Sequence, residues 1–174
     1  MPYLDHNASS PLLPVAFEAM RPWLTSRHGN ASSVHLDGQR ARAAIDDARE
    51  LIASRLGCAP RDLVFTSGGT ESDNLALRGL FRARSPRRRV VTTAIEHLAV
   101  LDTVRALEDA EVVVVGADSQ GIPDLSAFEA ALGPDTALAS VMFANNETGV
   151  RPPVEAFARA CRSAGVPLHV DACQ

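Results

Sequence analysis

The sequence predicts an α/β protein in which a mostly parallel sheet is flanked by helices. After residue 60, short apolar runs rich in branched residues alternate with segments of helical periodicity, and no internal repeat interrupts this rhythm. The apolar runs are nearly continuous, which is typical of strands covered by helices on both faces. Strands are expected at 63–66, 90–93, 112–115, 138–143 and 168–171.

Helices are expected between these strands, at 71–84, 97–109, 126–132 and 153–164. Thr70 and Ser126 are suitable N-caps, because a hydroxyl oxygen can accept from the unpaired amides of a first helical turn. Gly133 and Gly165 are suitable helix ends, because glycine adopts the left-handed conformation that often follows a last turn. The pattern therefore alternates one strand with one helix over the second part of the chain.

The first part of the chain reads differently. Apolar residues recur at helical spacing between Ala41 and Leu56, and Gly57 is expected to end that helix. Before it, an irregular arm contains one short helix at 14–20, which Pro22 is expected to interrupt because proline lacks an amide hydrogen. We therefore expect an N-terminal arm over residues 1–36 and a large domain over residues 37–174.

Composition excludes several classes of protein. The chain has 174 residues, 46% of them hydrophobic, which suits one packed core. A net charge of −4 argues against nucleic-acid binding, and an arginine cluster over 82–89 fits a solvated helix end. No apolar run approaches a membrane span, the N-terminus resembles no secretion signal, and the three cysteines are irregularly spaced. We expect a cytoplasmic protein that binds neither membrane nor nucleic acid.

The octet SGGTESDN, residues 67–74, predicts a strand-to-helix turn that binds an anion. Gly68 and Gly69 let a ligand approach the backbone, and Thr70 opens a helix whose first amides and dipole favour a phosphate group. A Gly-Gly turn with a threonine cap and no ligand is the alternative for the octet alone. The loop is not a Walker A motif, because the distal Gly-Lys-Ser/Thr is absent.

Two further polar residues follow expected strands at the sheet edge where ligands bind in parallel sheets. His97, in the dipeptide Glu96-His97, comes after the strand at 90–93, although its ring could instead be satisfied by backbone at a helix start. Asn146, in the run NNETG, comes after the strand at 138–143. Its amide could hold a ligand oxygen, but an Asn-rich turn ending in Gly149 is the alternative.

Asp171 and Gln174 end the chain on the last expected strand. A carboxylate at the end of an apolar strand needs a partner, and the protonated nitrogen of a pyridine ring is one candidate. A metal site is the alternative, because His169, Asp171 and Cys173 alternate along the strand and share one face. Three ligands on one strand rarely converge on a small ion, so we expect no metal.

In this order and spacing, the motifs resemble the cysteine desulfurases of the class V aminotransferase family, which depend on pyridoxal 5′-phosphate (PLP). Two N-terminal motifs, LDHNA at 4–8 and GNASSVH at 29–35, extend the resemblance over the whole chain. It implies the large domain of a fold-type I PLP enzyme. It also implies that Gly69 and Thr70 bind the cofactor phosphate, and that His97 stacks on the ring and transfers protons. The other implied cofactor-binding residues are Asn146, Asp171 and Gln174.

The resemblance implies an activity, and it also implies that residues needed for this activity are missing from the chain. Cysteine desulfurases convert L-cysteine to L-alanine and pass the sulfur on as a persulfide, as in iron–sulfur cluster biogenesis. The family uses a Schiff-base lysine and a mobile-loop cysteine, yet all 17 basic residues of this chain are arginine, and none of Cys58, Cys161 and Cys173 matches the loop position. We therefore expect an N-terminal fragment that is inactive alone.

Alternatives remain at this point. The chain could be a non-catalytic fragment that binds PLP, or part of another class V enzyme such as a selenocysteine lyase or a transaminase. For a complete desulfurase, the resemblance implies L-cysteine as substrate, a sulfur-acceptor protein as partner and a homodimer.

Overall fold

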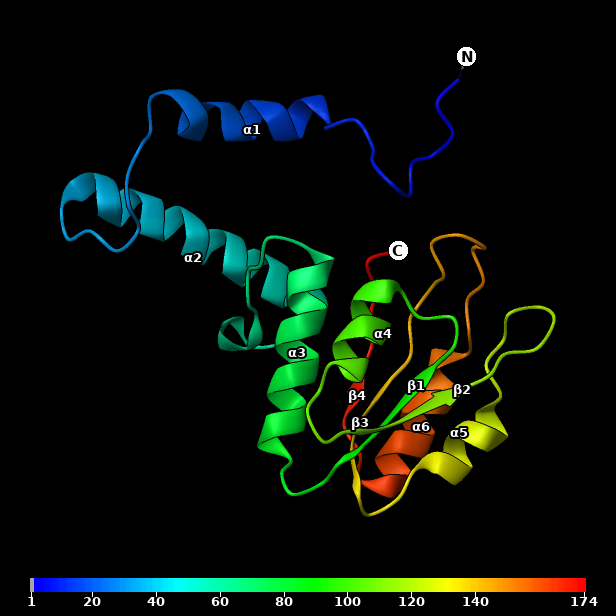
Figure 1. The fold of residues 1–174 in the computed structure, drawn as a ribbon. Helices are drawn as coiled ribbons and strands as arrows, with labels where there is room; N and C mark the ends of the chain where they lie inside the picture. Colours follow the sequence, from blue (N-terminus) through cyan, green and yellow to red (C-terminus); the bar gives the residue numbers. More distant parts are fainter. Residues whose placement is uncertain (1) are drawn as a thin grey trace. The chain divides into compact units, whose positions relative to one another are not determined.

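The computed structural model describes residues 2–174, which form two compact units. The first unit ends at Phe65 and the second begins at Thr66. The first contains helix α1 (Pro14–Thr25), helix α2 (Leu36–Leu56) and a 3₁₀ turn, η1 (Pro60–Asp62), as Figure 1 shows.

Helix α1 is longer than the sequence predicted, because Pro22 lies inside it instead of ending it. Proline at this place removes one helical hydrogen bond. The carbonyl of Pro22 accepts from the amides of Ser26 (3.0 Å) and Arg27 (2.7 Å), which close the last turn one residue after Thr25. The expectation of an interruption at Pro22 was therefore wrong.

Helix α2 begins at Leu36, before Ala41, the first apolar position expected in it. It ends before Gly57, as the sequence predicted. His35 precedes it, and Nδ1 of that ring accepts from the Gly38 amide at 3.4 Å. Gly57 follows the last turn with φ 71°, the left-handed conformation expected of it. Helix α2 falls in the first compact unit. The expected organisation, an arm over 1–36 and a large domain over 37–174, stays a prediction.

The expected strand at 63–66 does not form. These residues are extended but pair with no strand among residues 2–174, and Val64 and Phe65 are exposed. Instead, the Arg49 guanidinium donates to the Leu63 carbonyl and lies 4.8 Å from the centroid of the Phe65 ring. An extended segment becomes a strand only when a neighbour takes up its backbone hydrogen bonds.

The second unit confirms the predicted α/β fold. Its four parallel strands lie in the order β2-β1-β3-β4. They are β1 (Arg89–Thr93), β2 (Glu111–Val115), β3 (Thr136–Ser140) and β4 (Leu168–His169). The helices are α3 (Gly69–Ala83), α4 (Leu98–Arg105), α5 (Leu125–Ala131) and α6 (Val154–Ala164).

Both faces of this sheet are buried, as the continuous apolar runs predicted. Val90 and Leu138 pack on one side with apolar residues of α3 and α4, such as Leu77. Their neighbours in sequence, Val91 and Ala139, point to the opposite side and pack with residues of α5 and α6. Figure 1 shows these two helix pairs on the two sides of the sheet. Alternation along each strand therefore builds two separate cores.

Two of the predicted helix caps were wrong. Helix α5 is capped by Asp124, whose Oδ1 accepts from the amides of Ser126 (2.9 Å) and Ala127 (3.1 Å), so the helix starts before Ser126. Helix α3 likewise starts before Thr70, with Gly68 at the N-cap position. Gly165 ends α6 in the left-handed conformation (φ 64°), whereas α5 ends at Ala131 with Leu132 as its C-cap, so Gly133 does not end that helix.

Strands β3 and β4 continue side by side beyond their regular portions. The amide of Val141 donates to the His169 carbonyl (3.1 Å), and the amide of Phe143 donates to the Asp171 carbonyl (2.7 Å). These bonds carry the ladder past Ser140 and hold Asp171 at the carboxyl edge of the sheet. The same edge receives the loops that follow β1 and β3.

Candidate functional site

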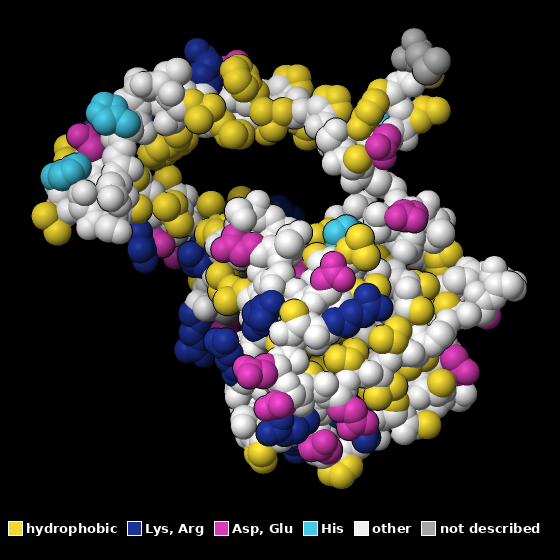
Figure 2. Space-filling model, viewed as in Figure 1, with side chains coloured by type: hydrophobic (Ala, Val, Ile, Leu, Met, Phe, Trp, Pro, Cys, Tyr) yellow, Lys and Arg dark blue, Asp and Glu magenta, His cyan; other side chains and the backbone are white. Residues whose placement is uncertain are grey.

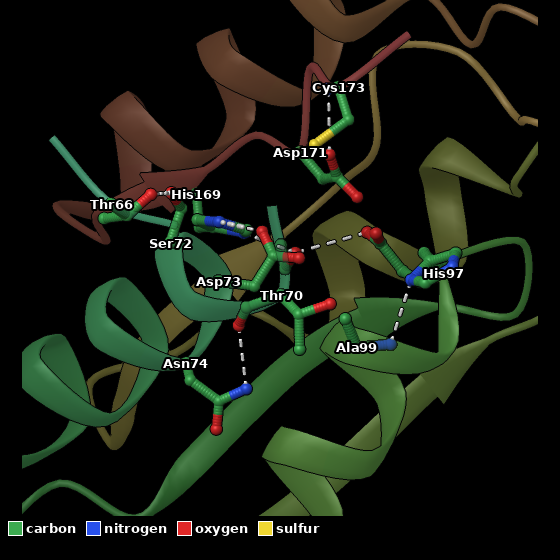
Figure 3. A network of polar contacts seen from close by, with 12 residues as sticks. Thr66, Thr70, Ser72, Asp73, Asn74, His97, Ala99, His169, Asp171 and Cys173 are labelled. Atoms are coloured by element: carbon green, nitrogen blue, oxygen red, sulfur yellow. Dashed lines mark hydrogen bonds and ion pairs between the residues drawn. The ribbon is translucent and has the colours of Figure 1, made fainter. Parts of the chain in front are cut away.

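Polar side chains from three segments gather at the carboxyl edge of the sheet. Figure 3 shows Thr70 at the start of α3, His97 at the start of α4, and Asp171 after β4 on the same side of the unit. Asp73 lies between them, in electrostatic contact with both Asp171 and His97. Residues from separate helix starts and from the segment after β4 therefore lie close together at this edge.

Side-chain hydrogen bonds stabilise the first turn of α3 without using its first backbone amides. Glu71 Oε2 accepts from both the backbone amide and the hydroxyl of Ser67, each at 2.6 Å, and Thr66 Oγ1 lies 2.7 Å from Ser72 Oγ. Gly68 occupies the N-cap position, and no side chain among residues 2–174 caps the helix there. The first amides of α3 therefore remain available to an anion, which the helix dipole also favours.

Gly69 permits a close approach between this turn and the end of the chain. A Cβ at position 69 would collide with Sγ of Cys173. A larger residue here would therefore require the Cys173 side chain to move. The same contact places the SGGT turn against the segment that carries Asp171.

His97 is the N-cap of α4, where its Nδ1 accepts from the Ala99 amide at 3.1 Å. Because Nδ1 is an acceptor, the exchangeable proton of the ring is on Nε2. The ring also lines an open pocket of about 450 Å³ together with Thr70 and Asn74. The backbone contact anticipated as the alternative for His97 is therefore present, and it fixes the tautomer of a ring that also faces a pocket.

Asn145 organises the NNETG loop. Its Oδ1 accepts from the amides of Glu147 (3.0 Å) and Thr148 (2.8 Å), and its Nδ2 donates to the Ile95 carbonyl at 2.9 Å. That last bond ties the loop after β3 to the loop that carries His97. Sequence analysis selected Asn146, the next residue, and missed this anchor because adjacent asparagines give the same turn signal.

Asp171 is buried, with 8% of its surface exposed, and its Oδ1 accepts from the Cys173 amide at 3.0 Å. Asp73 is also buried, and His169 Nε2 lies 3.4 Å from Asp73 Oδ1. Burial raises the pKa of Asp73 to about 6; Asp171 raises it further and His97 opposes the rise. Two carboxyl groups therefore share one partly desolvated region.

The alternating face of the last strand does not assemble metal ligands. Among residues 2–174 no three acidic, histidine or cysteine side chains are placed to hold an ion. His169 is directed to Asp73 and Ser140, whereas Cys173 lies against Gly69. Burial raises the pKa of the Cys173 thiol to about 11, with smaller contributions from Asp171 and Asp73.

The structure brings Gly69, Thr70, His97 and Asp171 together. Asn146 and Gln174 lie on the adjoining segments, and their part in the site stays a prediction, as do the individual roles of the other residues. Sequence analysis missed Asp73, although this residue lies inside the octet it selected. A buried acid on a helix is visible in sequence only once the helix face is known.

Fold and site define an α/β protein with an anion-accepting helix start and a buried carboxylate at one sheet edge. The family model of class V aminotransferases matches residues 2–174, so the chain belongs to that family. No helix among residues 2–174 is long and apolar enough to cross a membrane.

Relatives with curated names are cysteine desulfurases. An IscS-like cysteine desulfurase of Mycobacterium tuberculosis is 46% identical over 183 residues, which cover 100% of this chain and 46% of that protein. A human cysteine desulfurase is 43% identical, with 99% of this chain and 38% of the relative covered. The chain thus spans less than half the length of these relatives.

Solved structures give the same result. A NifS-like protein superposes with a TM-score of 0.92 at 36% identity, covering 97% of this chain and 47% of the other. A structure described as SspA in complex with cysteine also has a TM-score of 0.92, at 35% identity, with coverages of 99% and 50%.

Proposed function

We propose that this chain forms the cofactor-holding part of a PLP-dependent cysteine desulfurase. The reaction is the conversion of L-cysteine to L-alanine, with the sulfur transferred as a persulfide. One observation carries the proposal: an uncapped helix start, a pocket-lining histidine and a buried carboxylate converge at one sheet edge. The names of the relatives support the same activity.

The residues present fit the two charged ends of PLP. The first amides of α3, beside Gly69 and Thr70, suit the phosphate group because they lack a side-chain cap within the described chain. The opposite end, a protonated ring nitrogen, suits Asp171, whose buried carboxylate has another acid, Asp73, close by. An anion-accepting end and a cation-accepting end thus occur in one region.

When bound, PLP supplies a protonated ring that withdraws electrons from the bonds at the substrate α-carbon. Asp171 keeps the proton on the ring nitrogen, and its burial strengthens that contact. His97 presents Nε2–H at the pocket and can exchange a proton there, because Nδ1 is occupied by the Ala99 amide. We assign contacts to the cofactor oxygens to Asn146 and Gln174.

Two of the three cysteines are unsuited to accept sulfur. The pKa of Cys161 is raised to about 11 by burial, and that of Cys173 also to about 11, so both thiols stay protonated near neutral pH. We propose that the reactive cysteine and the Schiff-base lysine come from sequence outside these 174 residues, which contain no lysine. The 174-residue chain alone is then inactive.

We propose L-cysteine as the substrate, in keeping with the cysteine bound in the structure of SspA. A sulfur-acceptor protein, a homodimeric complete enzyme, a cytoplasmic location and a role in iron–sulfur cluster biogenesis belong to the same proposal. They rest on the resemblance to cysteine desulfurases, which the names of the relatives share.

The first experiment tests the 174-residue chain with PLP. We expect weak, reversible binding, measured by the absorbance and fluorescence of the cofactor, and no adduct after borohydride reduction and mass spectrometry. A cofactor fixed to the chain by borohydride would contradict the prediction that the chain cannot bind PLP covalently. Alanine formation from cysteine by the chain alone would contradict the prediction that it is inactive.

The second experiment restores the rest of the enzyme. We expect the chain, supplied with the complementary segment of a close relative, to release alanine from L-cysteine and to form a persulfide, which added dithiothreitol reduces to sulfide for detection. Parallel assays with selenocysteine and with amino-group acceptors distinguish a selenocysteine lyase or a transaminase. Failure to bind PLP or turn over any of these substrates would overturn the proposal.

Asp171→Ala and Cys173→Ser form a matched pair in that restored enzyme. Asp171→Ala should lower kcat by about a hundredfold or more, because it removes a pre-organised electrostatic contact. Cys173→Ser keeps the backbone amide that Asp171 accepts from and should lower kcat far less. The reverse ranking would refute the assigned role of Asp171.

A further inference from the structure

A row of polar side chains in close contact lies behind the candidate site. His169 Nε2 lies 3.4 Å from Asp73 Oδ1, and its Nδ1 lies 3.0 Å from Ser140 Oγ. Ser140 Oγ in turn lies 3.2 Å from Glu96 Oε1. Asp73, Ser140 and Glu96 are buried, and the row crosses from α3 through β4 and β3 to the loop after β1. Figure 3 shows its Asp73–His169 end beside Asp171.

Each donor in this row determines the donor and acceptor of the next contact, so all the donated hydrogens must point in the same direction along the row. Ser140 has one hydroxyl hydrogen, so it donates either to Glu96 or to His169. If Glu96 is ionised, Ser140 donates to it, and the hydroxyl oxygen must then take a hydrogen from His169 Nδ1. If Glu96 is a neutral acid, it donates to Ser140, Ser140 donates to His169 Nδ1, and the hydrogen of His169 is then on Nε2, which faces Asp73.

The surroundings of Glu96 favour the second arrangement. Its Oε2 is buried without a hydrogen-bond partner among residues 2–174, which is costly for an ionised carboxylate. Desolvation raises the pKa of Glu96 to about 8, and Asp171 and Asp73 add to the rise, whereas Ser140 and the Met142 amide oppose it. Burial lowers the pKa of His169, so this ring is neutral at pH 7.

We propose that Glu96, Ser140 and His169 are positioning residues that form a directed hydrogen-bond chain, with Glu96 as a neutral acid, and that this chain turns the Nε2 hydrogen of His169 toward Asp73, an anion beside Asp171. The site then presents two carboxylates to a bound cation, where Asp171 alone would present one. This consequence for the cofactor ring rests on the proposed function. The direction of the chain does not, because it concerns the protein without cofactor.

Other charged groups face Asp73 as well. His97 at the start of α4 lowers its pKa and Asp171 after β4 raises it, and Cys173 has a protonated thiol. None of these supplies a fixed positive charge. His169 Nε2, 3.4 Å from Asp73 Oδ1, is therefore the neighbouring nitrogen whose hydrogen can face this carboxylate.

Infrared spectroscopy of the cofactor-free chain tests the protonation of Glu96. With glutamate labelled by ¹³C at the side-chain carboxyl, we expect a neutral-acid carbonyl band at pH 7 that disappears above about pH 9. The band should be lost in Glu96→Gln and kept in Asp73→Asn and in Glu129→Gln, a change at an exposed acid of α5. A folded wild-type chain without this band, or a band that survives Glu96→Gln, would overturn the proposal.

Nitrogen NMR of the histidine rings tests the direction of the chain and does not depend on Glu96 variants folding. His169, assigned with His169→Gln, should be neutral at pH 7 with its proton on Nε2. A doubly protonated ring, or a proton on Nδ1, would overturn the proposal.

The last arm uses the restored enzyme and PLP. Asp73→Asn keeps an acceptor for His169 but removes the charge, and it should weaken PLP binding by about threefold to tenfold. Glu129→Gln should leave binding unchanged. Equal binding by wild type and Asp73→Asn would refute the role of the second carboxylate. A wild type that binds no PLP would instead refute the proposed function, with the infrared and NMR results unaffected.

Discussion

Gly69 and Gly79 lie on the same helix, α3, but the space around them differs. At position 69 a Cβ would strike Cys173 Sγ, whereas at position 79 it would meet no atom within 4 Å. Gly69→Ala should therefore disturb the α3 start and weaken binding of a phosphate-bearing ligand. Gly79→Ala should raise the free energy of unfolding by about 0.5–1 kcal/mol, because alanine favours the helix interior.

Urea denaturation and PLP fluorescence measure both effects. The double variant Gly69→Ala/Cys173→Ala should recover much of the loss, since it removes the atom that the new methyl group meets. If Gly69→Ala bound PLP as well as wild type does, the close approach would have no bearing on the site.

Single residues also show where sequence analysis succeeds and where it stops. Gly57 and Gly165 were predictable helix ends, because the left-handed conformation is a local property of glycine. Asp73 was not predictable as part of the site, because its importance comes from burial beside Asp171. Asn145 was hidden because its bond to the Ile95 carbonyl joins residues far apart in sequence.

At the scale of the element, α4 depends on the residue proposed for proton transfer. His97 caps this helix through Nδ1. His97→Asn should preserve stability, because asparagine is a strong N-cap, whereas His97→Ala should cost about 1 kcal/mol. Both variants should lose proton-transfer activity in the restored enzyme.

Thermal denaturation and kcat separate these two roles. An active His97→Asn variant would show that the ring serves only as a cap. Loss of stability in His97→Asn equal to that in His97→Ala would show that the ring contributes by packing.

The elements themselves were predicted unevenly, for physical reasons. The expected strands at 90–93 and 112–115 appear within one residue of their predicted starts, because runs of branched apolar residues favour strands, and the first of them is also buried on both faces. The run at 63–66 has similar composition but lacks a paired neighbour, so it forms no strand. Helix α3 starts before Thr70 because Glu71 reaches back to Ser67, a contact between side chain and backbone that a simple cap rule omits.

At the scale of the whole molecule, buried acids should make stability depend on pH. The folded pKa of Glu96 is raised from 4.5 to about 8, so between these values the folded chain binds more protons than the unfolded chain. Stability should therefore fall as pH rises through this window. Each pKa unit corresponds to about 1.4 kcal/mol, so Glu96 alone contributes at most about 5 kcal/mol.

Urea denaturation from pH 5 to 9 measures this dependence. Asp73, with its pKa raised to about 6, adds a fall in the lower part of the window, and His169, with a lowered pKa, adds a rise as pH increases toward 6.5. Glu96→Gln should flatten the decline between pH 6 and 8, where Glu96 dominates. A variant that declines as steeply as wild type would show that Glu96 is ionised throughout.

The order of strands also determines when the site can exist during synthesis. Strand β1 emerges from the ribosome first and lies between β2 and β3, so these three can assemble while later residues are still being added. Strand β4 comes after these three in the chain and has two residues of regular pairing with β3, and Asp171 follows it. The carboxylate therefore docks after β1, β2 and β3 have emerged, and amide hydrogens near His169, on the edge strand, should exchange with solvent sooner than those of Val90 and Val91 in the centre of the sheet.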